Sequence, residues 1–262
     1  MFKFFRRIRQ NFLNEGKTTK YFKYAIGEII LVVIGILIAL QINNWNEKRK
    51  EQEKEQVYLE RLKENLTLDL EHLKLNIDFY KQVFEYGNLA LAYSDGDTLE
   101  SKNNWEILVA FFHASQIWPL ILTSSTYEEL KSSGELSLLQ SINLRNSLSY
   151  FYGGGLERYN HTVGIYPPYR KMVRGLIPTR IQNYMWDHCH VTRNDAQILK
   201  SCDSFISEEE SKHILDGLIN NSILLEELRY FMSGIKVGLD TITEQLKLCQ
   251  LMLDEINTIQ NN

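Results

Sequence analysis

The richest group of chemically competent side chains is in the stretch WDHCHVTRND, where His188, Cys189 and His190 are consecutive. Imidazole and thiolate groups bind zinc and other soft metals, and Cys202 follows 13 residues after Cys189. The spacing matches no paired Cys-x-x-Cys motif, and adjacent residues of a helix point in different directions. One interpretation is a metal- or redox-responsive site built on His188, Cys189 and His190; the other is a polar loop or helix end.

Two further motifs carry weaker chemical signals. The glycine run at residues 153–155 is followed by no Lys-Ser/Thr pair and preceded by no strand pattern, so an interrupted helix is the plainer interpretation. Ser124 and Ser125 lack the Gly-x-Ser-x-Gly context of a serine nucleophile. We therefore predict no catalytic, cofactor-binding or metal-binding residue and expect a protein that is not an enzyme. An envelope enzyme with an unrecognised site is kept as an alternative.

Residues 24–42 have the length and composition of a membrane-spanning helix. Nineteen residues at about 1.5 Å each reach about 28 Å, close to the hydrocarbon thickness of a bilayer. Residues 1–23 hold seven Lys or Arg and one acidic residue, and such basic flanks stay in the cytoplasm. No small-residue cleavage pattern follows Ala39. We expect an uncleaved signal-anchor of the inner membrane, with residues 1–23 cytoplasmic and the chain from residue 43 extracytoplasmic.

Glu28 is an acidic residue inside this apolar segment. At about 100° per residue, one narrow face of the helix carries Glu28, Gly35, Ala39 and Asn46. Small residues four apart let two membrane helices approach closely, and a carboxylate in a bilayer needs a proton, a partner or water. We expect these four residues to form a face that docks on another membrane helix. In the alternative, Glu28 reaches water at the membrane edge or meets a nearby lysine.

Charge and cysteine content narrow the class of protein. The formal net charge is −4 although residues 1–23 are strongly basic, so the remaining chain is acidic and nucleic-acid binding is not expected. Three cysteines are too few for a disulfide framework. Cys189 and Cys202 could pair across a loop in an oxidising compartment, whereas three free thiols would suit a cytosolic domain. The cysteines therefore bear directly on the membrane orientation.

Apolar residues at three–four spacing dominate the rest of the chain. One stripe runs from Leu59 to Leu91 and another from Leu224 to Ile256, and each predicts a long helix that packs on the other. Turn residues at 94–97 end the first helix. Capping-box spacings, Thr126 before Glu129 and Ser207 before Glu210, mark shorter helices. Five tyrosines between residues 150 and 169 are interpreted either as bundle core or as a partner surface.

We therefore predict an all-α protein in which one N-terminal transmembrane helix continues into a long helix, followed by an antiparallel bundle of about four main helices. The expected organisation is a short basic segment (1–23), a transmembrane helix (24–42), a membrane-proximal long helix (43–93) and a bundle packing on it (94–262).

Three stretches, YAIGEIILVVIGILIALQINNWNEKRK, STYEELKSSGELSLLQ and LRNSLSYFY, resemble a bacterial family of single-span membrane proteins of unknown function. The resemblance covers most of the chain and implies an anchor and a helical domain, but no activity, ligand or catalytic residue. We expect a single-pass binding, scaffold or accessory component of a membrane complex. Its expected partners are the lipid bilayer and either a second copy or another membrane protein, and no nucleic acid.

Overall fold

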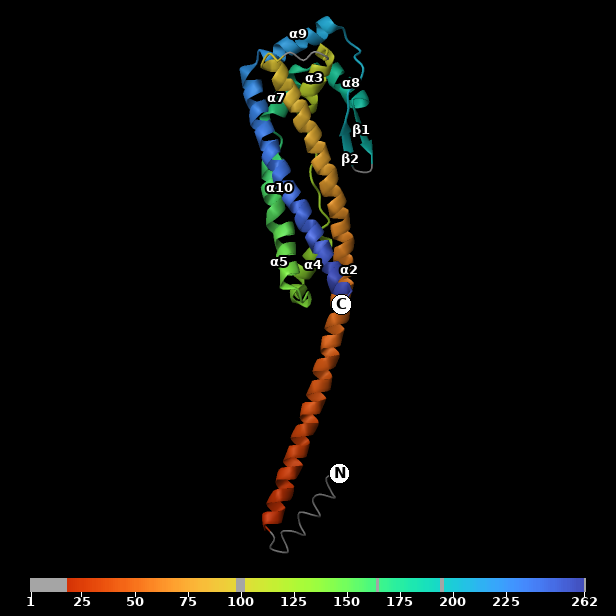
Figure 1. Cartoon of the computed structure of the whole chain (residues 1–262), viewed down its shortest axis with the longest axis vertical. Helices are drawn as coiled ribbons and strands as arrows, with labels where there is room; N and C mark the ends of the chain where they lie inside the picture. Colours follow the sequence, from red (N-terminus) through yellow and green to blue (C-terminus); the bar gives the residue numbers. More distant parts are fainter. Residues whose placement is uncertain (1–17, 98–101, 164, 194–195, 262) are drawn as a thin grey trace. The chain divides into compact units, whose positions relative to one another are not determined.

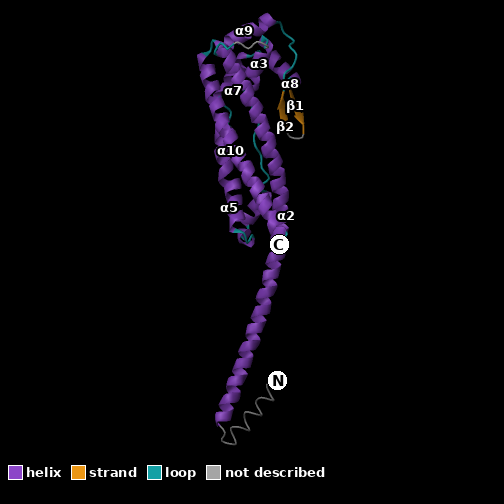
Figure 2. Ribbon diagram, in the orientation of Figure 1, coloured by secondary structure: helices purple, strands orange, loops and turns teal. Residues whose placement is uncertain are grey.

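The computed structural model describes residues 18–97, 102–163, 165–193 and 196–261. The all-α prediction is confirmed: helices dominate the described chain, and its only strands form one small hairpin (Figure 2). The chain divides into two compact units, Met1–Val57 and Tyr58–Asn262. The boundary falls inside the first described helix, α2 (Thr18–Ser94), which is 77 residues long.

The predicted continuity of the apolar segment with the long helix is confirmed, because α2 runs without a break to Ser94. It ends at the expected turn, where Gly96 has φ +88°, a left-handed value that favours glycine. The remaining elements follow in chain order: α3 (Asn104–His113), α4 (Ser125–Ser132), η1 (Glu135–Leu138), α5 (Ile142–Tyr150), the π-helix η2 (Phe151–Gly155), α6 (Leu156–Val163), α7 (Pro168–Leu176), α8 (Thr179–His188), β1 (His190–Arg193), β2 (Ala196–Leu199), α9 (Glu208–Ile219) and α10 (Ser222–Gln260).

Within the second unit, α2 and α10 pack side by side and antiparallel, as the two apolar stripes predict (Figure 1). Arg229 of α10 pairs with Asp95 just after α2, while the far end of α10 reaches Glu60 through Gln260. Between them, the buried Cys249 Sγ donates to the Leu66 carbonyl at 3.3 Å. The interpretation of Cys249 as a small core residue is confirmed.

The core of the second unit is built around α3, whose residues from Ile107 to His113 are all buried. Asn103 caps this helix and forms a full capping box with Glu106. Tyr159 and Tyr169 of the tyrosine group belong to the core, whereas Tyr150 and Tyr166 are exposed. The tyrosine group therefore does not form one continuous surface.

Several helix boundaries follow the sequence signals. Ser207 caps α9 by accepting a hydrogen bond from the Glu210 N–H, and Gly134 has φ +75° after α4. The glycine run interrupts a helix, as expected, by forming η2. A side chain on Gly155 would collide with Gln245 of α10, which accounts for glycine at that position.

Two expectations were wrong. Thr126 does not cap α4, because its own N–H donates to the Asn65 side chain of α2 at 3.4 Å and Ser124 occupies the position before the helix. The hairpin β1–β2, paired from His190↔Leu199 to Arg193↔Ala196, was not predicted. Its strands are four residues each, too short to establish a period-two pattern.

Candidate functional site

The predicted docking face lies in the first unit on α2. Side chains from Ile29 to Leu40 are exposed, and α2 is the described helix that is long and apolar enough to cross a membrane. A Cβ built on Gly35 meets nothing within 4 Å among the described residues. Glu28 and Asn46 are half-buried and Ala39 is exposed. The face therefore has the small-residue surface that close helix packing needs, and the docking itself stays a prediction.

Farther along, α2 carries a second, polar stripe that faces the domain interior. Its members recur every three or four residues, which puts them on one side of the helix. They are Tyr58, Arg61, Asn65, Asp69, His72, Asn76 and Tyr80. This polar stripe lies beside the leucine stripe that fills the core. The sequence analysis did not predict the polar stripe, because it considered only the spacing of apolar residues. The polar residues recur at the same three–four spacing, so this pattern would have revealed the stripe.

The polar stripe holds a segment without regular structure, residues 116–124, which we call the strap. Its backbone makes no ladder with another strand and contains Pro119, so its polar groups need other partners. Asn76 Nδ2 donates to the Trp118 carbonyl at 3.1 Å, and the Tyr80 hydroxyl donates to the same oxygen at 3.3 Å. Side chains of one helix thus replace the backbone partners that a sheet would supply.

Asp69 is the centre of this arrangement and is fully buried. One carboxylate oxygen accepts the Thr123 N–H of the strap at 2.6 Å, and the other accepts the Tyr152 hydroxyl of η2 at 2.7 Å. Burial raises the pKa of Asp69, and the hydrogen bonds from Thr123 and Tyr152 oppose that rise. The pKa of Tyr152 is raised by burial and then by the charge of Asp69. One side chain therefore joins α2, the strap and the π-helix.

A pocket of about 400 Å³ lies between the polar stripe and the strap. It is lined by His72, Leu75, Asn76, Trp118, Pro119, Leu120 and Ile121. The His72 Nδ1 atom is buried there and has no hydrogen-bond partner among the described residues. A mostly apolar pocket with a few polar groups has the character of a small-molecule site.

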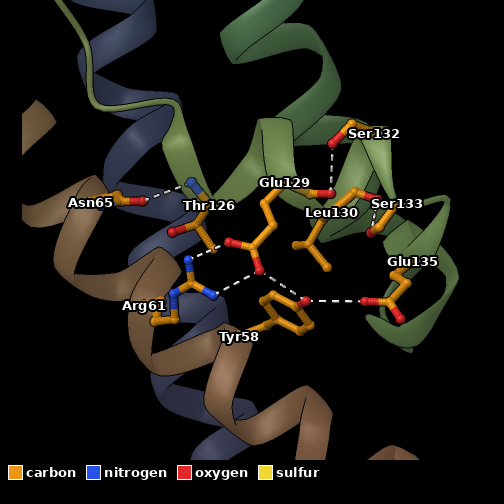
Figure 3. Close-up of polar contacts among 9 residues, drawn as sticks. All are labelled: Tyr58, Arg61, Asn65, Thr126, Glu129, Leu130, Ser132, Ser133 and Glu135. Atoms are coloured by element: carbon orange, nitrogen blue, oxygen red, sulfur yellow. Dashed lines mark hydrogen bonds and ion pairs between the residues drawn. The ribbon is translucent and has the colours of Figure 1, made fainter.

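Where α2 enters the second unit, Tyr58 and Arg61 contact Glu129 of α4 and Glu135 of η1 (Figure 3). We call this group of four residues the clamp. Arg61 binds both carboxylate oxygens of Glu129, with nitrogen–oxygen distances of 3.1 and 2.5 Å. The Tyr58 hydroxyl lies 3.2 Å from Glu129 Oε1 and 3.0 Å from Glu135 Oε2. Burial, followed by the hydrogen bond to Glu135, raises the pKa of Tyr58 to about 12. The hydroxyl therefore keeps its proton and bridges two carboxylates.

The predicted metal-competent cluster is not brought together. Cys189 and Cys202 form a disulfide with a Cα–Cα distance of 5.0 Å, so neither sulfur is a free thiolate. His188 ends α8 and stacks on the Tyr184 ring, whereas His190 begins β1 and meets Trp186 edge-on. Within the described ranges, no three His, Cys, Asp or Glu side chains are arranged to hold a metal ion. The metal interpretation is therefore not supported.

A family model described as a family of unknown function, DUF6090, matches residues 28–169. The chain belongs to the DUF6090 family. The match begins at Glu28 and includes the docking face, the polar stripe, the strap and the α4 clamp. The disulfide and α10 lie beyond the part of the chain that defines DUF6090. No curated protein and no solved structure matches this chain.

Proposed function

We propose that this DUF6090 protein is a single-pass inner-membrane protein that acts by binding, as a scaffold or accessory component of a membrane complex, rather than by catalysis. The observation that carries the proposal is the continuity of α2. The same helix bears an apolar segment with a small-residue face and, farther along, the polar stripe that organises the domain. A partner that binds the docking face would therefore contact α2, the helix on which the domain also packs.

Two observations support a cytoplasmic N-terminus and an extracytoplasmic domain. Residues 1–23 are rich in Lys and Arg, which stay on the cytoplasmic side. A disulfide between Cys189 and Cys202 is typical of an oxidising compartment, which supports an extracytoplasmic domain. Trapping thiols with N-ethylmaleimide in intact cells tests this placement. We expect Cys189 and Cys202 to resist alkylation until a reductant is added; two free thiols in cells would contradict the orientation.

The partner is a second copy or another membrane protein, because the face is suited to close approach by a helix. In lipid, association depends on packing of small residues and on polar contacts, since lipid tails are as apolar as leucine. Gly35 and Ala39 are the small residues that could pack against a partner, and Glu28 could make the polar contact. A carboxylate in this setting gains from a donor on the partner helix.

In-cell cross-linking of the full-length protein, followed by affinity isolation and mass spectrometry, tests the docking face. Glu28→Gln removes the charge and Gly35→Ile blocks close approach. Leu37→Phe is the matched control, because it enlarges a side chain about 180° away on the same helix. We expect one membrane partner, or self-cross-links, to be lost in both face variants and kept in the control. Retention in both face variants would overturn the proposal.

A further inference from the structure

Helix α7 places Arg170 and Arg174 one turn apart against the end of α3. The Arg170 Nη1 atom donates to the Ser115 carbonyl at 2.5 Å and lies 3.4 Å from Gln116 Oε1. The Arg174 Nε atom donates to the Ser115 hydroxyl at 3.2 Å. Both guanidinium groups thus contact Ser115, Arg170 also reaches Gln116, and both arginine side chains are half-buried.

Aromatic rings fix the orientation of these guanidinium groups. The Arg174 guanidinium carbon lies 4.2 Å from the centre of the Phe112 ring and 5.0 Å from that of Trp186. The Arg170 guanidinium carbon lies 5.5 Å from the centre of the Tyr166 ring. Stacking of this kind leaves the in-plane N–H groups of an arginine free to bind planar anions.

No carboxylate compensates the two positive charges within the described residues. Among the residues that the structure describes, neither arginine takes part in an ion pair, in contrast to Arg61, Arg180 and Arg229. Burial lowers the pKa of Arg170. Burial, and then the positive charge of Arg170, lower the pKa of Arg174 to about 9. Adjacent cations held away from water are unfavourable unless an anion joins them.

One N–H donor of Gln116 and one of Arg174 lack acceptors within the described part of the chain. Gln116 is 1% exposed, and its Nε2 atom has no hydrogen-bond partner among the described residues. The Arg174 Nη2 atom is also buried and has no hydrogen-bond partner in the described ranges. Buried donors are normally satisfied, so such a pair indicates a missing acceptor. A water molecule would satisfy the donors, but only an anion would also balance the charge.

We propose that Arg170, Arg174 and Gln116 form a binding site for a small oxyanion, the carboxylate or phosphate group of a ligand that reaches the domain. Guanidinium groups bind both kinds of anion through paired N–H···O hydrogen bonds. The amide of Gln116 adds a neutral donor from the buried side. The site is independent of the docking face, because it belongs to the second unit alone.

Thermal unfolding of the full-length protein in detergent micelles tests the proposal, with inorganic phosphate and succinate as probes and sodium chloride at matched ionic strength as the reference. We expect at least one probe to raise Tm saturably and to change tryptophan fluorescence, because Trp186 contacts Arg174. Phosphate alone would identify a phosphate site, and succinate alone a carboxylate site. A rise that does not saturate reflects general salt exclusion and would count against the site.

Variants assign the effect to these residues. Arg174→Gln removes a positive charge, and Arg170→Lys keeps the charge but loses the paired N–H geometry of an arginine. Each variant should weaken the apparent affinity for the probe about tenfold or more. Arg180→Gln is the control, since Arg180 is exposed and pairs with Glu210. If Arg174→Gln does not fold, Arg170→Lys and Gln116→Leu decide the question. Absence of saturable binding, or binding that no variant weakens, would overturn the proposal.

Discussion

Two regions of the same helix, α2, use apolar residues in opposite ways. Between Ile29 and Leu40 they cover the whole circumference and stay exposed in the first unit. Between Leu59 and Ala90 most of them keep to one stripe and are buried, although Leu68 is exposed, and the polar stripe beside them holds the strap. Apolar residues without periodicity thus indicate a helix surrounded by lipid, and periodic ones indicate a helix packed on protein.

The polar residues of the two regions also differ in their surroundings. In the first region, Glu28 stands among apolar residues, where a carboxylate needs a proton, a partner or water. In the second, Asp69 is buried with both oxygens engaged by the same fold. A polar residue in an apolar surrounding is therefore either a structural link, as at Asp69, or a contact reserved for another molecule, as we propose for Glu28.

The largest effect that separates the regions should come from leucine truncation. Leu73→Ala removes a fully buried side chain and should lower the free energy of unfolding of the domain by about 3 kcal/mol, whereas Leu37→Ala should leave it unchanged. Urea unfolding, monitored through the alkylation of Cys249, measures the free energy of unfolding of both variants. Burial, and then the charge of Asp69, raise the pKa of that thiol to about 12, so it reacts slowly in the folded state. Equal sensitivity of both leucines would contradict the comparison.

Asp69→Leu should be the most damaging change in the polar stripe. It leaves the Thr123 N–H and the Tyr152 hydroxyl without their acceptor, at a cost of about 2 kcal/mol in the free energy of unfolding. Asp69→Asn should cost less, because the amide keeps one oxygen and the Tyr152 hydroxyl also lies 3.3 Å from the Thr123 carbonyl. Urea denaturation of both variants measures the difference, and equal losses would contradict the role of the second oxygen.

The raised pKa of Asp69 predicts a pH dependence of stability. Because burial raises this pKa above its ordinary value of 3.8, the folded state holds the proton more tightly than the unfolded chain. The stabilisation that comes from this tighter proton binding is fully present below pH 3.8, and it is lost as the pH rises through the pKa of Asp69 in the folded state. Measured between pH 4 and 7, the stability of the wild type should therefore fall more than that of Asp69→Asn. Parallel profiles would show that Asp69 does not titrate in this range.

Two glycines of α2 give a smaller contrast. A methyl group on Gly87 would collide with the Met232 side chain, whereas one on Gly35 meets nothing within 4 Å. Gly87→Ala should therefore destabilise the domain by about 1 kcal/mol, after the helix-favouring effect of alanine is included. Gly35→Ala should not change domain stability. Thermal unfolding of the two variants tests this, and a stabilised Gly87→Ala would mean that Met232 moves aside freely.

The clamp between α2 and α4 should contribute least. Tyr58→Phe removes the hydroxyl that bridges Glu129 and Glu135, but Glu129 keeps its ion pair with Arg61. The expected loss is about 0.5 kcal/mol in the free energy of unfolding. Spectrophotometric titration supplies an independent check, because the tyrosine that ionises at a pH of about 12 should disappear in the variant.

Much of the fold could be predicted from local signals. The turn after Ser94, the end of α4 at Gly134, the cap at Ser207 and the interruption at residues 153–155 each depend on residues close in sequence. The cap at Thr126 failed because a side chain from α2, Asn65, binds its N–H. The metal-competent side chains are not brought together, because a disulfide joins the two cysteines and the histidines lie in different elements; a redox role stays a prediction.

The sequence by itself determined the all-α class, the apolar segment, the two long helices and the four residues that share one side of the first helix, because helical periodicity and hydropathy are properties of a single segment. Only the tertiary structure decided that the strap lies along α2, that Asp69 joins three elements and that two arginines meet at Ser115 without a carboxylate among the described residues. These contacts join residues 38 to 83 positions apart in sequence. No local pattern specifies such pairs, because they form when the packed core brings distant segments together.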